Sequence, residues 1–151
     1  MNDAHFHLLV NHFPIIGLFF GIAILLFGII KKNPLLINTA YVIFIFCMVM
    51  GKVAMFSGEK AEEIVENLGI SHDLIHEHEE LAEGYMKVMY LLGIASIMGM
   101  YANYKKHTKA LLTAYLVLIV AVVAMIMASN VGTSGGEIRH TEINNPPVEK
   151  H

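Results

Sequence analysis

The stretch LLVNHFPIIGLFFGIAILLFGII, residues 8–30, decides the fold, because it carries no Asp, Glu, Lys or Arg over a length that can cross a bilayer. A hydrocarbon core of about 30 Å needs roughly 20 apolar residues in a helix. Three further, mostly apolar runs follow at residues 35–56, 81–104 and 110–128. The chain is 56% hydrophobic with a mean hydropathy of +0.58, which is too apolar for an ordinary soluble domain. The sequence therefore predicts an all-α, integral membrane four-helix bundle.

Local signals set the expected ends of the helices. Pro14 predicts either a kink in the first helix or the position of its first turns, because proline removes a helix hydrogen bond. The second helix is expected to end at Ser57-Gly58, and residues 59–69 then predict a separate short amphipathic helix. Ser71 is the expected N-cap of the third helix.

Lysines mark the two short connections between the apolar runs. The positive-inside rule places such loops in the cytoplasm. We therefore expect a multi-pass protein of the bacterial inner (cytoplasmic) membrane, N-out and C-out, with its outer side periplasmic. The bundle is expected to form one domain, residues 1–140, followed by a C-terminal tail at 141–151. The net charge of -3 gives no reason to expect a nucleic-acid partner. The lysines are Lys31 and Lys32 in the first connection, and Lys105, Lys106 and Lys109 in the second.

Histidines gather on the predicted outer side of the membrane, since only His107 of the nine falls on the other side. Imidazole is costly in hydrocarbon and is the commonest side-chain ligand for metals and haem iron. The single cysteine, Cys47, excludes an intrachain disulfide and a thiolate metal cage. This pattern predicts a redox cofactor or a metal near one membrane face. The outer histidines are His5, His7, His12, His72, His76, His78, His140 and His151.

Helical geometry separates the histidines of the third helix. At about 100° per residue, His78 heads an apolar face that continues through Tyr85 and Met89. His72 and His76 fall on the opposite, solvated face. His78 is therefore a candidate ligand, with a satisfied structural histidine as the alternative. A Zn or Cu site at His72 and His76 is a weaker hypothesis than two solvated side chains.

His12 is expected within the outer leaflet, about 10 Å along the helix axis from His5. A histidine there needs a partner, a cofactor or a wet cavity, which makes it a candidate ligand. Gly17 and Gly21 form a small-xxx-small pair nearly opposite His12. Either these glycines face a second protomer or partner subunit while His12 faces the bundle interior, or the glycines face inward and His12 does not.

The segment His7-Leu-Leu-Val-Asn-His12-Phe-Pro-Ile resembles the opening of a family of small bacterial four-helix membrane proteins, catalogued as domain of unknown function 2231. Members carry a histidine entering the third span, as in His78-Glu-Glu-Leu-Ala. They also carry a Gly-Gly turn after the fourth span, as in Gly135-Gly136-Glu-Ile-Arg-His140. The resemblance covers residues 7–140 and implies a protein similar to a membrane b-type cytochrome. It extends to His7, His12, His78 and His140, and not to His5, His72 or His76.

The leading hypothesis is a haem-b electron-transfer protein, because two imidazoles on facing helices of an apolar bundle can ligate iron axially. We expect one haem, or two, with His12 and His78 as the axial pair. His7 and His140 are the reserve ligands. The electron partner would be a periplasmic cytochrome c, a copper protein or a quinone in the membrane.

Two cations are available on the histidine side for haem propionates. Lys52 either snorkels outward or pairs with Glu79 or with a propionate, and Arg139 is the second candidate.

Two other hypotheses remain open. One is a periplasmic-side Zn- or Cu-binding membrane protein centred on His72 and His76. The other is a cofactor-free accessory subunit of a larger membrane complex, and a homo-oligomer is also expected from the glycine pair. The sequence has no phosphate-binding glycine loop and no H-E-x-x-H motif, so we expect no independent enzymatic activity.

Overall fold

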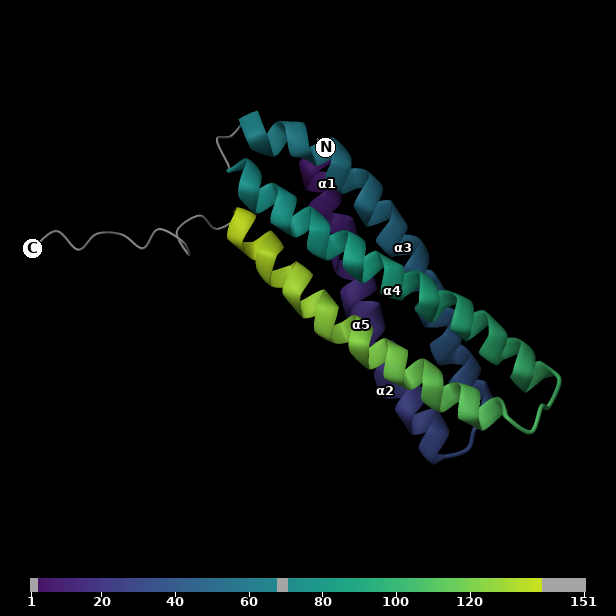
Figure 1. Cartoon of the computed structure of the whole chain (residues 1–151). Coiled ribbons are helices and arrows are strands. Elements are labelled where there is room, and N and C mark those ends of the chain that lie inside the picture. Colours follow the sequence, from purple (N-terminus) through teal and green to yellow (C-terminus); the bar gives the residue numbers. More distant parts are fainter. Residues whose placement is uncertain (1–2, 68–70, 140–151) are drawn as a thin grey trace, which may run out of the picture.

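The computed structural model describes residues 3–67 and 71–139 (Figure 1). A single break at Asn11 separates α1 from α2, so these two helices form one leg of a four-helix bundle. His140, His151 and the predicted tail at 141–151 lie outside the described residues. The helices are α1 (Asp3–Val10), α2 (His12–Ile30), α3 (Pro34–Asn67), α4 (His72–Tyr104) and α5 (Ala110–Arg139).

Four helical segments are long and apolar enough to cross a membrane. Many large apolar side chains point away from the bundle, and Phe19 and Ile126 are each 61% exposed. Such a surface is unsuited to water but is solvated by lipid tails. Helix length and composition thus confirm the prediction of an all-α, multi-pass membrane bundle. The segments are His5–Ile30, Pro34–Glu62, His72–Tyr104 and Ala110–Ile138.

The helices are arranged so that α2 and α4 lie diagonally opposite each other. The α2 helix packs against α3 and α5, and α4 packs against the same two helices, while α1 packs mainly on α3 (Figure 1). We call the end where α1 and α4 begin, and where α3 and α5 end, the histidine end. The opposite end holds the turns at Lys31–Asn33 and Lys105–Lys109, and we call it the lysine end.

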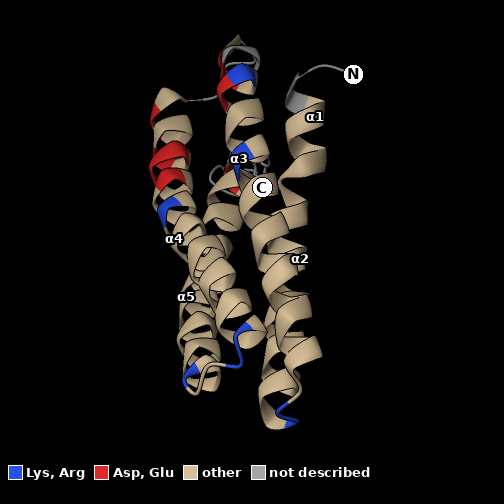
Figure 2. Cartoon of the chain, turned by 90° about the vertical axis from the view of Figure 1, so that its right-hand side faces the viewer, with Lys and Arg blue, Asp and Glu red and all other residues tan. Residues whose placement is uncertain are grey.

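Charge is distributed unevenly between these two ends. Lysines mark both turns at the lysine end, whereas the carboxylates gather on α3 and α4 towards the histidine end (Figure 2). At 34 and 33 residues, α3 and α4 are about 50 Å long at 1.5 Å per residue. A hydrocarbon core of about 30 Å cannot contain them. Their acidic turns therefore project beyond it.

The glycine face of α2 points into the bundle. A Cβ added at Gly17 would overlap Cys47 Sγ, and one at Gly21 would overlap the Phe44 ring, both on α3. Small residues permit this close approach of two helices. Of the two arrangements left open by the sequence, the glycines therefore face inward. His12, on the other side of α2, is exposed.

Two expected helix ends are wrong. Ser57-Gly58 does not end the second helix, because α3 continues to Asn67, and residues 59–67 are its last turns rather than a separate helix. Gly135-Gly136 does not form a turn either, because α5 runs through it to Arg139. Glycine is a weak helix former, but tertiary packing overrides that preference here: a histidine ring packs against Gly58 and another against Gly135.

The first leg is interrupted three residues before Pro14. Proline has no N–H for the carbonyl of Val10, and the helix assignment stops at that residue and resumes at His12. Asn11 keeps helical dihedrals and donates its backbone N–H to the His7 carbonyl at 3.0 Å. The predicted kink is therefore a local break that leaves the leg continuous. Ser71 precedes α4 with an extended backbone, as expected of an N-cap, but makes no side-chain capping hydrogen bond.

Candidate functional site

His7 lies on α1 at the histidine end and packs against α3. Its Nδ1 atom is 3.0 Å from the backbone carbonyl of Ala54 and 3.0 Å from Ser57 Oγ. A Cβ at Gly58 would come within 3.3 Å of the ring, so the glycine leaves space for the imidazole. The helix break at Asn11 thus follows, by one turn, a histidine that is half-buried and held by the neighbouring helix.

His78 on α4 repeats this arrangement against α5. Its Nδ1 atom is 2.8 Å from Ser134 Oγ, and a Cβ at Gly135 would come within 3.2 Å of the ring. Like His7, His78 is half-buried. Each histidine is therefore supported by a Ser-Gly pair on the helix that follows it in its own hairpin.

The serine hydroxyls define which nitrogen of each ring carries the proton. Ser57 donates its hydroxyl hydrogen to the Ala54 carbonyl at 2.9 Å, and Ser134 donates to the Val131 carbonyl at 3.0 Å. A hydroxyl has one hydrogen, so each serine oxygen is left to accept. With each serine oxygen accepting, both Nδ1 atoms act as donors and the neutral rings carry the lone pair on Nε2. At His7 the Ala54 carbonyl, which can only accept, requires the same tautomer.

The two imidazoles belong to diagonally opposite legs, and both lie at the histidine end of the bundle. Within residues 3–67 and 71–139, no hydrogen bond to either Nε2 atom is recorded. A neutral imidazole with Nδ1–H held by an oxygen acceptor is the usual state of a histidine metal ligand. His7 and His78 thus form a pair of oriented nitrogen donors, which we call the histidine pair.

Two buried polar atoms lie deeper in the bundle below the histidine pair. Asn11 follows His7 by one helical turn, and Tyr85 follows His78 by two turns. In the described part of the chain, Asn11 Oδ1 and the Tyr85 hydroxyl are buried without a hydrogen-bond partner. A buried polar group without a partner costs free energy. The interior at this level is therefore suited to a further hydrogen-bonding group, such as water or part of a ligand.

The other predicted haem residues lie elsewhere. His12 is exposed, and its Nδ1 atom is 2.9 Å from the Leu8 carbonyl of its own leg. Lys52 is also exposed and borders a shallow groove between α3 and α4 together with Glu83 and Lys87. The structure therefore places His78 and the reserve ligand His7 at the same end of the bundle as half-buried side chains, and it leaves His12 exposed. Arg139 is the last residue of α5, and His140 lies outside the described residues.

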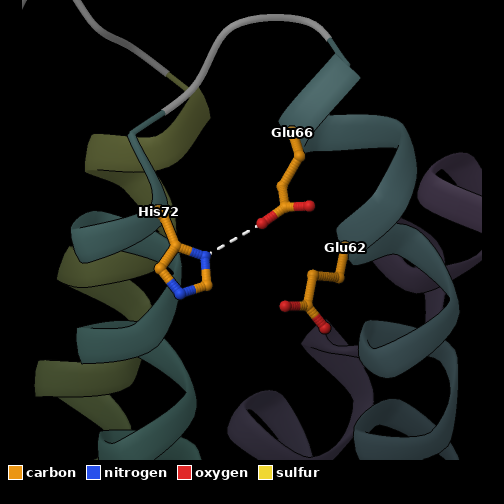
Figure 3. A group of neighbouring side chains, drawn as sticks. All are labelled: Glu62, Glu66 and His72. Atoms are coloured by element: carbon orange, nitrogen blue, oxygen red, sulfur yellow. Dashed lines mark hydrogen bonds and ion pairs between the residues drawn. The ribbon is translucent and has the colours of Figure 1, made fainter.

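His72 and His76 have different neighbours. The Nδ1 atom of His72 is 2.9 Å from Glu66 Oε1, across the connection between α3 and α4 (Figure 3). His76 Nδ1 is 3.9 Å from Glu80 Oε1 on its own helix. The two rings contact each other edge to face, with centroids 6.4 Å apart. Both side chains are exposed, as the helical angles predicted.

Ser57 was predicted only as part of a helix end, and Ser134 was not predicted to have a role. A signal was present, because each serine is followed by glycine and then, within three residues, by a glutamate: Ser57-Gly58-Glu59 and Ser134-Gly135-Gly136-Glu137. In each hairpin this motif lies on the helix after the histidine and the lysine turn. Recognition of that internal repeat would have paired His7 with His78.

No family model matches the chain, and neither a curated protein nor a solved structure matches it. The resemblance to domain of unknown function 2231 therefore stays a prediction. The chain is a four-helix protein with four candidate membrane spans.

Proposed function

We propose that the protein binds haem b between His7 and His78 and transfers electrons at one face of the membrane. The observation that carries this proposal is the histidine pair, in which each Nδ1–H is directed to an oxygen acceptor and each Nε2 lone pair is left for a ligand. This ligand pair replaces His12 and His78, since His12 is exposed on the far side of α2.

The donor set favours haem b among iron cofactors. Two neutral imidazoles are suitable axial ligands, and the legs that carry them lie on opposite sides of the bundle interior. The single cysteine excludes the paired thioether attachment of a c-type haem. Haem b held by two histidines supplies a one-electron carrier without an open coordination position, which favours electron transfer over substrate chemistry.

Residues around the histidine pair have positioning roles in this proposal. Ser57 and Ser134 fix the ring orientation and the tautomer of His7 and His78, as acceptors beyond metal ligands commonly do. The buried Asn11 amide and Tyr85 hydroxyl supply hydrogen-bonding groups on the membrane side of the pair. Lys52 and Arg139 remain the candidate cations for propionates.

The site lies on the outer side if the lysine end is cytoplasmic, as the positive-inside rule requires. In a bacterial inner membrane the electron partner would then be a periplasmic cytochrome c, a copper protein or a quinone. A homo-oligomer or a place in a larger membrane complex is compatible with this role.

Visible spectra of the detergent-purified protein, produced with ample haem, test the proposal. We expect sharp α and β bands after dithionite reduction and a b-type pyridine haemochrome. His7→Ala and His78→Ala should each abolish the low-spin spectrum, whereas the matched controls His12→Ala and His76→Ala should retain it. His78→Met should keep the iron but raise the reduction potential, a change that loss of folding does not produce.

Three outcomes would contradict this proposal. A colourless wild-type protein would exclude haem. Full haem retention in both the His7 and His78 variants would exclude the histidine pair as its ligands. Loss of haem in His12→Ala would restore His12 as the ligand.

A further inference from the structure

A second group of possible metal ligands lies at the histidine end, outside the histidine pair. Glu62 and Glu66 are one turn apart near the end of α3, and His72 is the first residue of α4 (Figure 3). One ligand atom from each of the three side chains lies within 4.8 Å of the other two. The group therefore combines two carboxylates from α3 with an imidazole from α4.

The spacing of these atoms approaches that of a metal coordination sphere. Zn²⁺ lies about 2.0–2.2 Å from nitrogen and oxygen ligands in tetrahedral geometry, so two ligands on one ion are separated by roughly 3.3 Å to 3.6 Å. The His72 and Glu66 side chains are 70% and 45% exposed and Glu62 is half-buried, so two of the three side chains face open space in which they can turn towards an ion. The ligand atoms can therefore close on an ion without a change in the helices.

The type of donor selects the class of cation. Ca²⁺ and Mg²⁺ prefer sites made only of oxygen atoms, whereas an imidazole nitrogen favours first-row transition metals. No thiolate is available, because the single cysteine is buried in the core. A site with one histidine and two carboxylates suits Zn²⁺, with water in the remaining position.

We propose that Glu62, Glu66 and His72 bind a divalent first-row transition cation, Zn²⁺ in the first instance, between the end of α3 and the start of α4. The ion replaces the direct hydrogen bond between His72 and Glu66 and joins the two helices through metal bonds. Because the liganding groups are at the surface, the ion exchanges with the medium. This site is independent of the proposed haem function and differs from one formed by His72 and His76.

The site predicts a specific pH dependence. A proton on the His72 imidazole competes with the ion for the same nitrogen, so zinc affinity should fall as the pH is lowered. The ion pair between His72 and Glu66 needs the protonated imidazole, so its contribution to stability should grow as the pH is lowered. Stabilisation by zinc and stabilisation by the ion pair therefore change in opposite directions with pH.

The experiment is zinc titration of the full-length, tag-free protein in detergent, followed by calorimetry and by thermal unfolding. We expect one zinc ion that His72→Ala, Glu62→Gln and Glu66→Gln each weaken by at least about tenfold. The controls His76→Ala and Glu80→Gln lie on the same exposed surface and should bind as wild type. Zinc should raise the midpoint of unfolding in wild type and in the controls, and not in the three site variants.

His7→Ala/His78→Ala is included because the histidine pair could itself bind zinc. Retention of the site in this double variant, together with its loss in His72→Ala, assigns the ion to the α3–α4 group. Unchanged zinc binding in all three site variants, or weakening by His76→Ala as strong as that by His72→Ala, would overturn the proposal. Absence of zinc binding to wild type would leave the His72–Glu66 ion pair as the whole of the interaction.

Discussion

The hairpin formed by α1, α2 and α3 and the hairpin formed by α4 and α5 share a lysine turn and a histidine held by a Ser-Gly pair, but their helices pack differently. Both turn at the lysine end with similar backbone: Lys32 and Lys106 each have a φ of 49°, and the lysine before each, at the end of its helix, has a φ of -82° and -77° respectively. Each hairpin also holds one histidine against a Ser-Gly pair at the other end. The similarity indicates that the site has two equivalent halves, one from each hairpin.

The difference lies in how the helices of each hairpin approach one another. The α3 helix inserts large side chains into glycine positions, with Phe44 against Gly21 of α2 and Tyr41 against Gly99 of α4. The α5 helix instead contributes small side chains to the core, where its buried residues include several alanines. Each hairpin therefore holds its histidine against a Ser-Gly pair, although α3 is bulky and α5 is small where they pack. The alanines are Ala114, Ala121, Ala124 and Ala128.

The largest expected effect on stability comes from filling the space at Gly21, where α2 packs closely against α3. Gly21→Leu places a side chain where the Phe44 ring lies, and we expect a loss of about 3 kcal/mol or more in the free energy of unfolding. Gly132→Leu on α5 is the matched control, because no atom lies within 4 Å of its added Cβ. Thermal unfolding in detergent measures both. Equal destabilisation by the two variants would contradict the packing difference between the hairpins.

A smaller effect is expected from the serines, and it tests the equivalence of the two halves. Ser57→Ala and Ser134→Ala each remove an acceptor for a histidine Nδ1–H, and we expect haem affinity to fall by about tenfold in each. Ser96→Ala is the control, since Ser96 is a buried serine whose hydroxyl donates only to the Leu92 carbonyl of its own helix. Haem titration of the purified variants provides the measurement. A change in only one serine variant would show that the two halves are unequal.

The smallest effect is expected at the two lysine turns. Lys32 and Lys106 adopt a left-handed conformation that glycine adopts without steric cost, so Lys32→Gly and Lys106→Gly should each stabilise the fold by about 1 kcal/mol. The preceding residues Lys31 and Lys105 are in the right-handed region, and their replacement by glycine should not stabilise. Unfolding midpoints compare the four variants. A gain in one turn alone would mean that the two turns do not carry the same strain.

Much of the architecture could be predicted from composition and periodicity. Four apolar runs of sufficient length determine four helices, because every backbone polar group in lipid must be paired within the structure. Helical periodicity also placed His78 on the inner face of α4 and His76 on the outer face, since the angle per residue is constant along a regular helix. The break near Pro14 followed from the missing N–H.

Helix ends were less predictable, because glycine has opposite roles depending on its neighbours. Ser57-Gly58 and Gly135-Gly136 have the composition of helix terminators, yet both lie within helices where a histidine ring from another helix occupies the space at the glycine. That ring comes from a residue about fifty positions away in the sequence. No local pattern contains such a contact.

By itself, the sequence of this protein determined the number of membrane-crossing helices, the segregation of histidines from lysines and the inner face of α4. Only the tertiary structure decided that Gly17 and Gly21 face inward, that His7 is half-buried whereas His12 is exposed, and that His72 lies near Glu62 and Glu66. The physical reason is that length and periodicity act along one helix, whereas α2 is apolar on all sides and has no pattern to set its rotation. Its orientation comes from the close fit of its glycines against Phe44 and Cys47, which exists only once the helices have packed.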